Sequence, residues 1–217
     1  MFLGSFASGP WQANCYLLAD EPPSECVIID PGVGAADTVR QAVIEHQLTP
    51  AAILATHGHI DHIASAAILA DEYRIPLYID PADRHLLTDP AAGLDADAAA
   101  LAALLLPDGL AEPQLLEGYS PTIEVAGFTF QVAAAPGHTR GSVLLTPTGL
   151  DPRITFTGDV LFAGSIGRTD FPGGNRHQMR VTLDTVVKAL PPDTIILPGH
   201  GPTTTMSHEL QVNPYLK

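Results

Sequence analysis

Three histidines and one aspartate lie close together in one short segment, "THGHIDHIAS", at residues 56–65. Its metal-binding side chains are His57, His59, Asp61 and His62. Imidazole and carboxylate groups together are ligands for zinc, iron or manganese. The segment therefore predicts a metal site, although by itself it does not say how many metal ions are bound.

Three more side chains of the same kind follow apolar runs elsewhere in the chain. "FTFQVAAAPG" precedes His138, "RITFTG" precedes Asp159, and "TIILPG" precedes His200, just as "AAILAT" precedes His57. Buried strands anchor the backbone, and the turns at their ends expose side chains to a cleft. We expect these four strand ends to build one site.

The number of ligands favours two metal ions. A catalytic zinc ion takes about three protein ligands and a water molecule, whereas this chain offers five imidazoles and two carboxylates. Two ions roughly 3.5–4 Å apart fit that number. The ligand types leave zinc, iron and manganese open. The other histidines lack a strand-end context and are expected on the surface: His46, His85, His177 and His208.

Short strand-like runs alternate with helical segments along the chain. The runs are "NCYLLA", "CVIID", "AAILAT", "PLYID", "TIEVAGFTFQVAAA", "SVLLT", "RITFT" and "TIILP", each bounded by Pro, Gly or Asp. Helices are expected at 35–47, 63–73, 96–106 and 177–190, and a loop-rich excursion near the site at 83–120. This order predicts an α/β fold with two helix-covered sheets, in a chain of 217 residues, the length of one domain.

Composition limits the location and the partners. No apolar run reaches the roughly 18 residues of a membrane span. The first basic residue is Arg40, so we expect no secretory signal and a cytoplasmic protein. The net charge of -14 argues against nucleic acid as a partner. Cys15 and Cys26 are expected to be buried thiols, with a disulfide across a hairpin as the alternative.

"THGHIDH", "PGHTRGS", "TGDVLFAGSIGRTD" and "LPGHGPTT", in that order, resemble the metallo-β-lactamase superfamily. Almost end to end, from "NCYLL" through "IIDPG" to "NPYL", the chain is similar to the short, single-domain glyoxalase II branch, the hydroxyacylglutathione hydrolases. The resemblance implies an αββα sandwich of two mixed β-sheets flanked by helices over residues 1–217, without a C-terminal helical glutathione-binding domain. Where many members have Gly, this chain has Ser65, a difference expected to affect packing.

The same resemblance implies roles for individual residues. His57, His59 and His138 would hold one metal ion, Asp61, His62 and His200 the other, and Asp159 would bridge them. Two divalent ions are expected, zinc first, with iron or manganese as alternatives. Asp30, in "IIDPG", would orient a ligand or simply form the turn.

The implied activity is hydrolysis of a thioester of a low-molecular-weight thiol, of the S-lactoylglutathione type, by a metal-bound hydroxide. Asp61 and Asp159 would also act in catalysis by organising the nucleophile. The expected partner is a small anionic thioester, with neither nucleic acid nor membrane; the oligomeric state stays open. A rim of arginines could bind the anion: Arg140, Arg168, Arg176 and Arg180.

Other activities of the superfamily remain as alternatives. A persulfide dioxygenase would use a single iron ion held by His57, His138 and Asp159, a pattern suited to O₂ chemistry. A secreted β-lactamase would need export, and many of these enzymes have Cys at the position of Asp159. An inactive interaction module would be expected to have lost ligands, and all seven are present.

Overall fold

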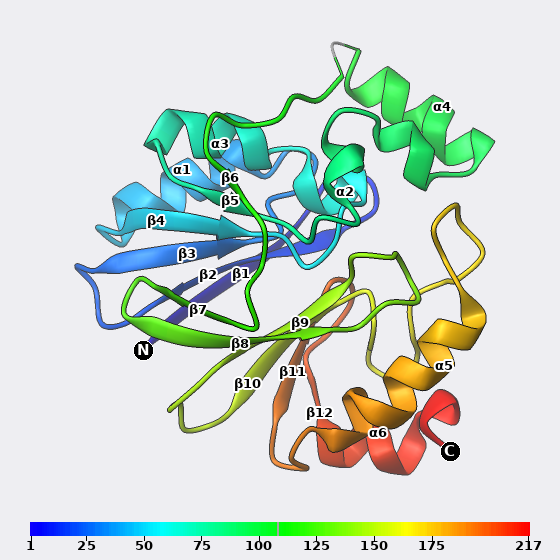
Figure 1. Ribbon diagram of the computed structural model, residues 1–217. Helices are drawn as coiled ribbons and strands as arrows, with labels where there is room; N and C mark the ends of the chain where they lie inside the picture. The colour runs from blue at the N-terminus through cyan, green and yellow to red at the C-terminus, as the bar shows by residue number, and fades with distance from the viewer. Residues whose placement is uncertain (108) are drawn as a thin grey trace.

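The strands of the computed structural model, which describes residues 1–107 and 109–217, form two six-stranded sheets (Figure 1). The first has the order β1-β2-β3-β4-β5-β6, with strands Phe2–Ser8, Ala13–Ala19, Glu25–Ile29, Thr49–Leu54, Leu77–Tyr78 and Leu116–Glu117. The second has the order β12-β11-β10-β9-β8-β7; in chain order, β7 to β12 are Thr122–Val125, Phe128–Ala134, Val143–Pro147, Ile154–Gly158, Ile195–Pro198 and Thr204–Thr205. Both sheets mix parallel and antiparallel pairs.

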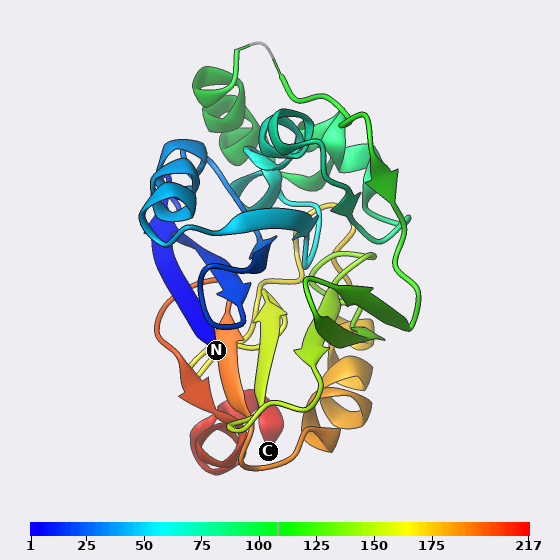
Figure 2. The same cartoon turned by 90° about the vertical axis from the view of Figure 1, so that its left-hand side faces the viewer.

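Helices cover the outer faces of the two sheets (Figures 1 and 2). Helices α1 (Ala36–Glu45) and α3 (Ala66–Tyr73) pack on the first sheet, and α5 (Arg176–Thr185) and α6 (Met206–Val212) pack on the second. The short α2 (Ile60–Ile63) and α4 (Ala96–Leu105) lie at one edge (Figure 1). Single 3₁₀ turns occupy Arg84–Leu87, Pro90–Gly93, Val187–Ala189 and Pro214–Leu216. The predicted αββα sandwich is confirmed.

The alternation of side chains along a strand explains why three layers of core form. In β2, Cys15 and Leu17 point to the core under α1 and α3, whereas Tyr16 and Leu18 point to the other sheet. Successive strand residues face opposite sides, and here both sides are apolar because both are covered. Phe130 and Phe156, both fully buried, bring the second sheet into the central layer.

The predicted helices are all present, with shifted ends. The predicted helix 63–73 corresponds to α3, which begins at Ala66, and the short α2 before it was not predicted. The segment 177–190 ends its α-helix at Thr185 before a 3₁₀ turn. Strand β1 and helix α6 were not predicted. In β1 only every second residue is shielded, and Phe2 and Phe6 pack against the core, a weak signal in a segment containing Gly4 and two serines. Asp108, inside the predicted excursion 83–120, lies outside the described residues.

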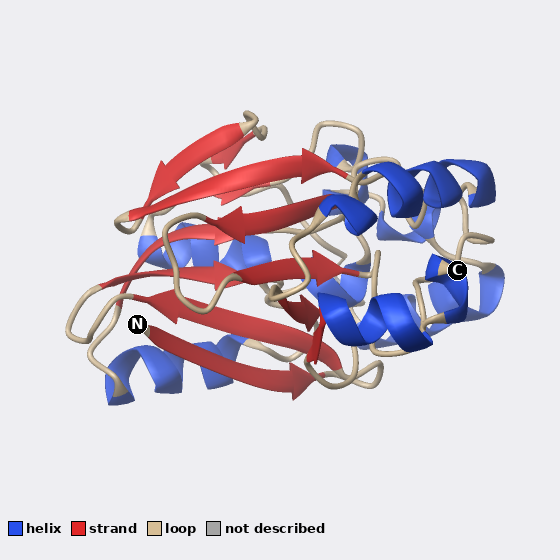
Figure 3. Ribbon diagram, turned by 90° about the horizontal axis from the view of Figure 1, so that it is seen from below, coloured by secondary structure: helices blue, strands red, loops and turns tan. Residues whose placement is uncertain are grey.

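The prediction of two buried thiols is confirmed. Cys15 and Cys26 are both buried free thiols, and the strand register pairs Cys26 with Ala19, so no disulfide joins them. Burial raises the pKa of the Cys26 thiol to about 12. Within the described residues, no helix is both long and apolar enough to cross a bilayer. The two chain ends lie at different sides of the molecule (Figure 3).

Candidate metal centre

The seven predicted ligands come from loops at one edge of the two sheets. His57 follows β4, His138 lies between β8 and β9, Asp159 directly follows β10, and His200 follows β11. His59 precedes α2, and Asp61 and His62 lie within it. Strands β3 and β4 are parallel, as are β10 and β11, so their carboxyl ends open at the same edge. The strand-end pattern read from the sequence thus agrees with the positions of His57, His138, Asp159 and His200, whereas His59, Asp61 and His62 reach the same edge through α2.

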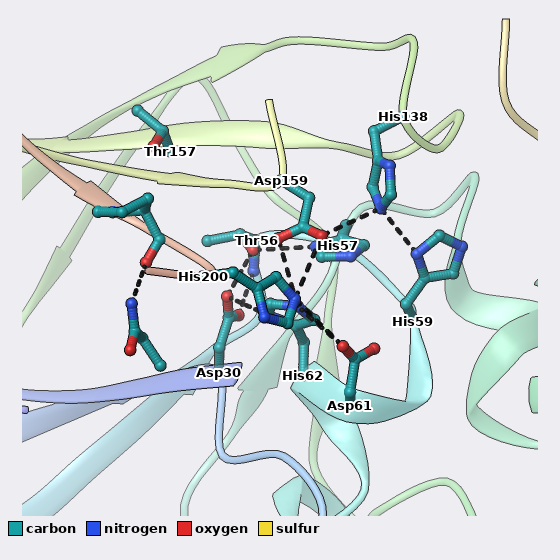
Figure 4. Close-up of polar contacts among 12 residues, drawn as sticks. Asp30, Thr56, His57, His59, Asp61, His62, His138, Thr157, Asp159 and His200 are labelled. Atoms are coloured by element: carbon teal, nitrogen blue, oxygen red, sulfur yellow. Dashed lines mark hydrogen bonds and ion pairs between the residues drawn. The ribbon is translucent and has the colours of Figure 1, made fainter. Parts of the chain in front are cut away.

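The first group of ligands consists of three buried histidines: His57, His59 and His138 (Figure 4). One nitrogen of each lies within 4.8 Å of the others, and His59 Nδ1 is 2.8 Å from His138 Nε2. The Nδ1–H of His138 donates to the carbonyl oxygen of Arg168 at 2.7 Å. This bond leaves the Nε2 lone pair of His138 directed into the group, which is the arrangement a metal ligand requires.

His57 is oriented by a chain of two hydrogen bonds. The Thr56 hydroxyl donates to Asp30 Oδ2 at 2.6 Å, so its oxygen accepts from His57 Nδ1 at 3.1 Å. The tautomer that follows keeps the proton on Nδ1 and leaves Nε2 bare. His57 Nε2 is buried and has no hydrogen-bond partner.

The second group consists of Asp61, His62 and His200. His200 Nε2 lies 3.2 Å from Asp61 Oδ2 and 3.3 Å from His62 Nε2. His62 is fully buried, while Asp61 and His200 keep part of their surface exposed to the cleft. These residues come from opposite sheets, because α2 follows the first sheet and His200 follows the second.

Asp159 lies between the two groups (Figure 4). Its Oδ2 is 3.5 Å from His138 Nε2 in the first group and 3.4 Å from His200 Nε2 in the second. Its Oδ1 is 3.4 Å from His62 Nε2 and, like His57 Nε2, is buried without a hydrogen-bond partner. Buried polar atoms are seldom left unpaired. Unpaired nitrogen and oxygen atoms that converge from two ligand groups fit divalent metal ions.

Asp30 supports the ligands from beneath. Its Oδ1 accepts from the Thr56 backbone N–H at 2.7 Å, and its Oδ2 lies 3.0 Å from His62 Nδ1. Asp30, His57 and His62 also lie close enough together to hold an ion. We assign Asp30 the supporting role because both of its oxygens already accept hydrogen bonds, and the bond to His62 leaves Nε2 of that histidine for the metal.

Burial and neighbouring charges separate the histidines into two electrostatic classes. Burial keeps the pKa of His57 well below its usual range and lowers that of His59 to about 3, with neighbouring histidines adding to both effects. Both side chains are therefore neutral at pH 7 and have lone pairs to donate. Burial also lowers the pKa of His62, but the carboxylates of Asp61, Asp159 and Asp30 outweigh it and raise the value to about 9.

The carboxylates are held in their ionised form. Burial would raise the pKa of Asp159, but His62 and His200 outweigh it and keep the value well below the usual range. The pKa of Asp61 is lowered by the same histidines, again against burial. In return, the hydrogen bonds to Asp159 and Asp61 overcome the burial of His200 and raise its pKa to about 10. An ionised carboxylate between the two groups is suited to bridge two cations.

A buried carboxylate that the sequence analysis did not identify joins the two histidine loops. Asp83 is 1% exposed. Its Oδ2 accepts from the backbone N–H of Gly58 at 2.9 Å and from the Thr139 hydroxyl at 2.6 Å, and its Oδ1 accepts from the N–H of Gly141 at 2.8 Å. Gly58 lies between two ligands of the first loop, and Thr139 directly follows His138. The segment "DPADRHLL" carries no motif that would have revealed this contact.

The loop that carries His200 is packed closely against its neighbours. A Cβ atom at Gly199 would collide with the Asp159 carboxylate and the His62 ring, so the "PGH" sequence needs glycine there. From the first sheet, Asn14 Nδ2 donates to the carbonyl oxygens of Pro198 and Gly201 at 2.9 and 3.0 Å. These bonds give the "NCYLL" segment a function in positioning His200.

The ligands open into a cleft of about 520 Å³. Its floor includes His59, Asp61, His138, Asp159 and His200; its walls are Trp11, Ile60, Leu94, Asp95, Asp97, Ala98, Leu101, Phe162, Gly167, Arg168 and Phe171. The predicted excursion 83–120 therefore does lie near the site, since it supplies the wall from Leu94 to Leu101. Of the wall residues, Ile60, Phe162, Gly167 and Arg168 lie within the motifs read from the sequence, whereas Trp11 and the stretch from Leu94 to Leu101 gave no recognisable pattern.

The four predicted arginines do not lie together on this cleft. Arg140 lines a separate hollow beside Asp83. Arg168 lines both the cleft and a third hollow around α5, and Arg176 and Arg180 line that third hollow with it. Their role in binding substrate stays a prediction. Of the histidines expected on the surface, His85, His177 and His208 are exposed, while His46 is half-buried against Phe2.

With this geometry in place, comparison with known proteins decides the family. The sequence pattern of the metallo-beta-lactamase superfamily matches residues 8–200, which include all seven ligands. This chain belongs to that superfamily.

Several members of the superfamily are similar to the chain over nearly its whole length. The "Probable metallo-hydrolase YqgX" of Bacillus subtilis is 34% identical, covering 96% of this chain and 94% of the relative. "Hydroxyacylglutathione hydrolase GloC" of Haemophilus influenzae is 32% identical, covering 95% and 93%. Membership and these relatives support a metal-dependent hydrolase with a His/Asp metal site.

Solved structures agree on the fold. A structure described as the BLEG-1 B3 metallo-beta-lactamase is 36% identical, with a TM-score of 0.86 and complete coverage of both chains. TTHA1623 in a di-iron-bound form is 34% identical, with a TM-score of 0.78 over 98% of this chain and 100% of that one. TTHA1623, whose structure holds two iron ions, therefore has the same fold as this chain.

Proposed function

We propose that this protein hydrolyses thioesters of a low-molecular-weight thiol with the help of two metal ions. The observation that carries the proposal is the position of Asp159, whose carboxylate reaches His138 on one side and His62 and His200 on the other. Ligand groups joined in this way suit two metal ions better than one. The similarity to GloC supports the thioester as substrate.

A bound metal ion and the residues of the chain would supply different parts of the chemistry. A bound divalent ion polarises a carbonyl oxygen and lowers the pKa of water. Water adds to the thioester carbonyl carbon, the C–S bond breaks, and a carboxylate and a thiol are released. Asp61, partly exposed at the cleft, and Asp159 stay ionised and can accept the proton of the attacking water. A thiol with a pKa of about 8.5 leaves readily as the thiolate, so no further acid is needed.

Zinc is the metal that we propose first, because neutral imidazoles and carboxylates suit it. Iron is the alternative, and the di-iron form of TTHA1623 supports it. We also retain a cytoplasmic location, and the absence of nucleic-acid and membrane partners, as predictions from the sequence.

Two other activities are distinguished by the same assays. A persulfide dioxygenase would need only His57, His138 and Asp159 around one iron ion. A β-lactamase has the support of the 36% identity to BLEG-1. Purified protein should be given lactoylglutathione, glutathione persulfide and a chromogenic cephalosporin in separate assays, after its metal content has been measured. Two metal ions per chain and thiol release without O₂ uptake support our proposal. One iron with O₂ consumption, or cleavage of the cephalosporin alone, contradicts it.

The bridging role of Asp159 has its own test. Asp159→Ala should lower the metal content below two ions per chain and abolish thioester hydrolysis. Asp193→Ala is a matched control, since Asp193 is exposed and only pairs with Arg153. If the Asp159 variant keeps both metal ions, the bridging role is wrong.

A further inference from the structure

The walls of the cleft differ in chemistry from its floor. Away from the metal ligands, seven apolar or aromatic side chains form most of the lining: Trp11, Ile60, Leu94, Ala98, Leu101, Phe162 and Phe171. A cleft of about 520 Å³ lies in the range that encloses most of a small organic ligand. A lactoyl group is small and polar and would leave this apolar surface in contact with water.

Helix α4 supplies much of this wall, and its sequence is unusual. "ADAAALAALL" is apolar on every side after its first turn. Small residues, Ala98 and Ala102, pack it near Ile60 and Trp11, while Leu101 reaches the cleft. Figure 1 shows α4 at the edge of the molecule, beyond α2. The helix thus closes one side of the cleft with aliphatic carbon.

Among the described residues that line the cleft away from the metal ligands, the one cationic side chain is Arg168, and protein groups already engage it. Arg168 donates to both oxygens of Asp170, at 2.7 and 2.9 Å, and its Nη2 lies 3.8 Å from Asp95 Oδ2. Its guanidinium carbon lies 3.5 Å above the Phe171 ring. A substrate carboxylate would have to compete with Asp170 and Asp95 for this guanidinium.

The remaining charges on the walls are negative. Asp95 and Asp97 both line these walls, where Arg168 is the one cationic side chain among the described residues. The whole chain has a net charge of -14, so no long-range field attracts an anion. A glutathione thioester carries two carboxylates and one ammonium group. The walls therefore offer the two carboxylates of this substrate little favourable charge.

We propose that the cleft selects thioesters by an apolar acyl chain that lies along Trp11, Leu101 and Phe171, and that a charged thiol carrier adds little to recognition. This inference rests on the proposed thioesterase function and names its substrate class. Burial of each methylene in an apolar cleft is worth about 0.8 kcal/mol, which corresponds to about fourfold in kcat/KM.

The test compares thioesters of one neutral thiol, N-acetylcysteamine, with metal-loaded protein. The acyl groups are acetyl, butyryl, hexanoyl and lactoyl, and the measurement is kcat/KM for thiol release. We expect about 200-fold between acetyl and hexanoyl, from four methylenes at about fourfold each. S-lactoylglutathione should be cleaved no more than about threefold faster than S-lactoyl-N-acetylcysteamine.

Two variants of α4 locate the effect. Leu101 lines the cleft, whereas Leu104, one turn along the same helix, is 78% exposed and is not part of the lining. Leu101→Gln should reduce the hexanoyl-to-acetyl ratio at least tenfold, and Leu104→Gln should leave that ratio unchanged. A ratio is used because it does not depend on metal loading or on the fraction of folded protein.

Each outcome has one meaning. A flat chain-length series, or a preference of more than tenfold for the glutathione carrier, overturns the inference and leaves the thioesterase function intact. An unchanged ratio in Leu101→Gln also overturns it. If the metal-loaded protein cleaves none of these thioesters, the proposed function itself fails.

Discussion

The buried carboxylate of Asp83 makes a prediction that can be calculated from its contacts. Asp83→Asn keeps the shape of the side chain but replaces one acceptor oxygen by an amide nitrogen. If the amide oxygen stays with Gly58 and Thr139, the nitrogen faces the backbone N–H of Gly141, and one hydrogen bond to a charged acceptor is lost. Such a loss costs about 2 kcal/mol at a buried site.

The expected effects are on both stability and metal affinity. For a chain of this length, about 2 kcal/mol lowers the midpoint of thermal unfolding by about 4–8 °C. Asp83 holds Gly58 beside His57 and His59, and Thr139 beside His138. The variant should therefore also bind metal about 10- to 100-fold more weakly, the usual effect of removing a group that orients ligands.

Thermal unfolding of the metal-free protein, followed by circular dichroism, measures the first effect, and competition with a chromophoric chelator measures the second. Asp89→Asn is the matched control, because Asp89 is exposed and lies six residues further along the same segment. If Asp83→Asn unfolds earlier but binds metal as tightly as the parent, Asp83 stabilises the fold without positioning the ligands. If neither quantity changes, the hydrogen-bond argument is refuted.

Three further predictions follow from other buried groups. The pKa of His62 is raised to about 9, against about 6.5 in the unfolded chain, so the protonated ring stabilises the metal-free fold fully below pH 6.5. This stabilisation, up to about 3 kcal/mol, should disappear as the pH rises through 9. Unfolding by urea at pH 6.5 and 9.5 measures the loss, and a His62→Gln variant with the same alkaline loss would contradict the prediction. Asp30→Asn should weaken metal binding about 10- to 100-fold, measured by chelator competition, because His62 Nδ1 loses its charged partner; unchanged affinity would assign Asp30 to the turn alone. Glu209 is fully buried and accepts hydrogen bonds from Gly164, Thr204 and Asn213. In urea unfolding, Glu209→Ala should therefore cost about 3 kcal/mol or more, and Glu209→Gln, which can still donate to the Thr204 hydroxyl, only about 1 kcal/mol. Equal losses would mean that these hydrogen bonds are not what stabilises the fold around Glu209.

The ligands could be predicted from the sequence because their position depends on local chemistry. An apolar run that ends in Gly or Thr before His or Asp specifies a buried strand and an exposed turn. The convergence of His57, His138, Asp159 and His200 then follows from the strands opening at one edge. Asp83 has no such local signal, because its function arises only when the loops that contain Gly58 and Gly141 come together around it.

The position of the predicted arginine rim could be inferred from the sequence only in part. Three arginines within residues 168–180 look like one positive patch along the chain. In the structure all three line one hollow around α5, and Arg168 also lines the cleft. Arg180 is paired with Asp184, one helical turn away. Closeness along the chain thus predicted that the three arginines gather, but it did not indicate that only Arg168 of the three also lines the cleft with the metal ligands.

The groups that support the ligands explain why the site can exist before the metal arrives. Asp30 and Asp83 hold the loops around His57 and His138 by hydrogen bonds to backbone N–H groups and hydroxyls. Asn14 holds the loop of His200 from the opposite sheet. Each support has its own partners and none depends on an ion. Hydrogen bonds within the fold therefore offset the conformational entropy lost in ordering the ligand loops. The free energy of metal binding then adds to the stability of the contact between the two sheets.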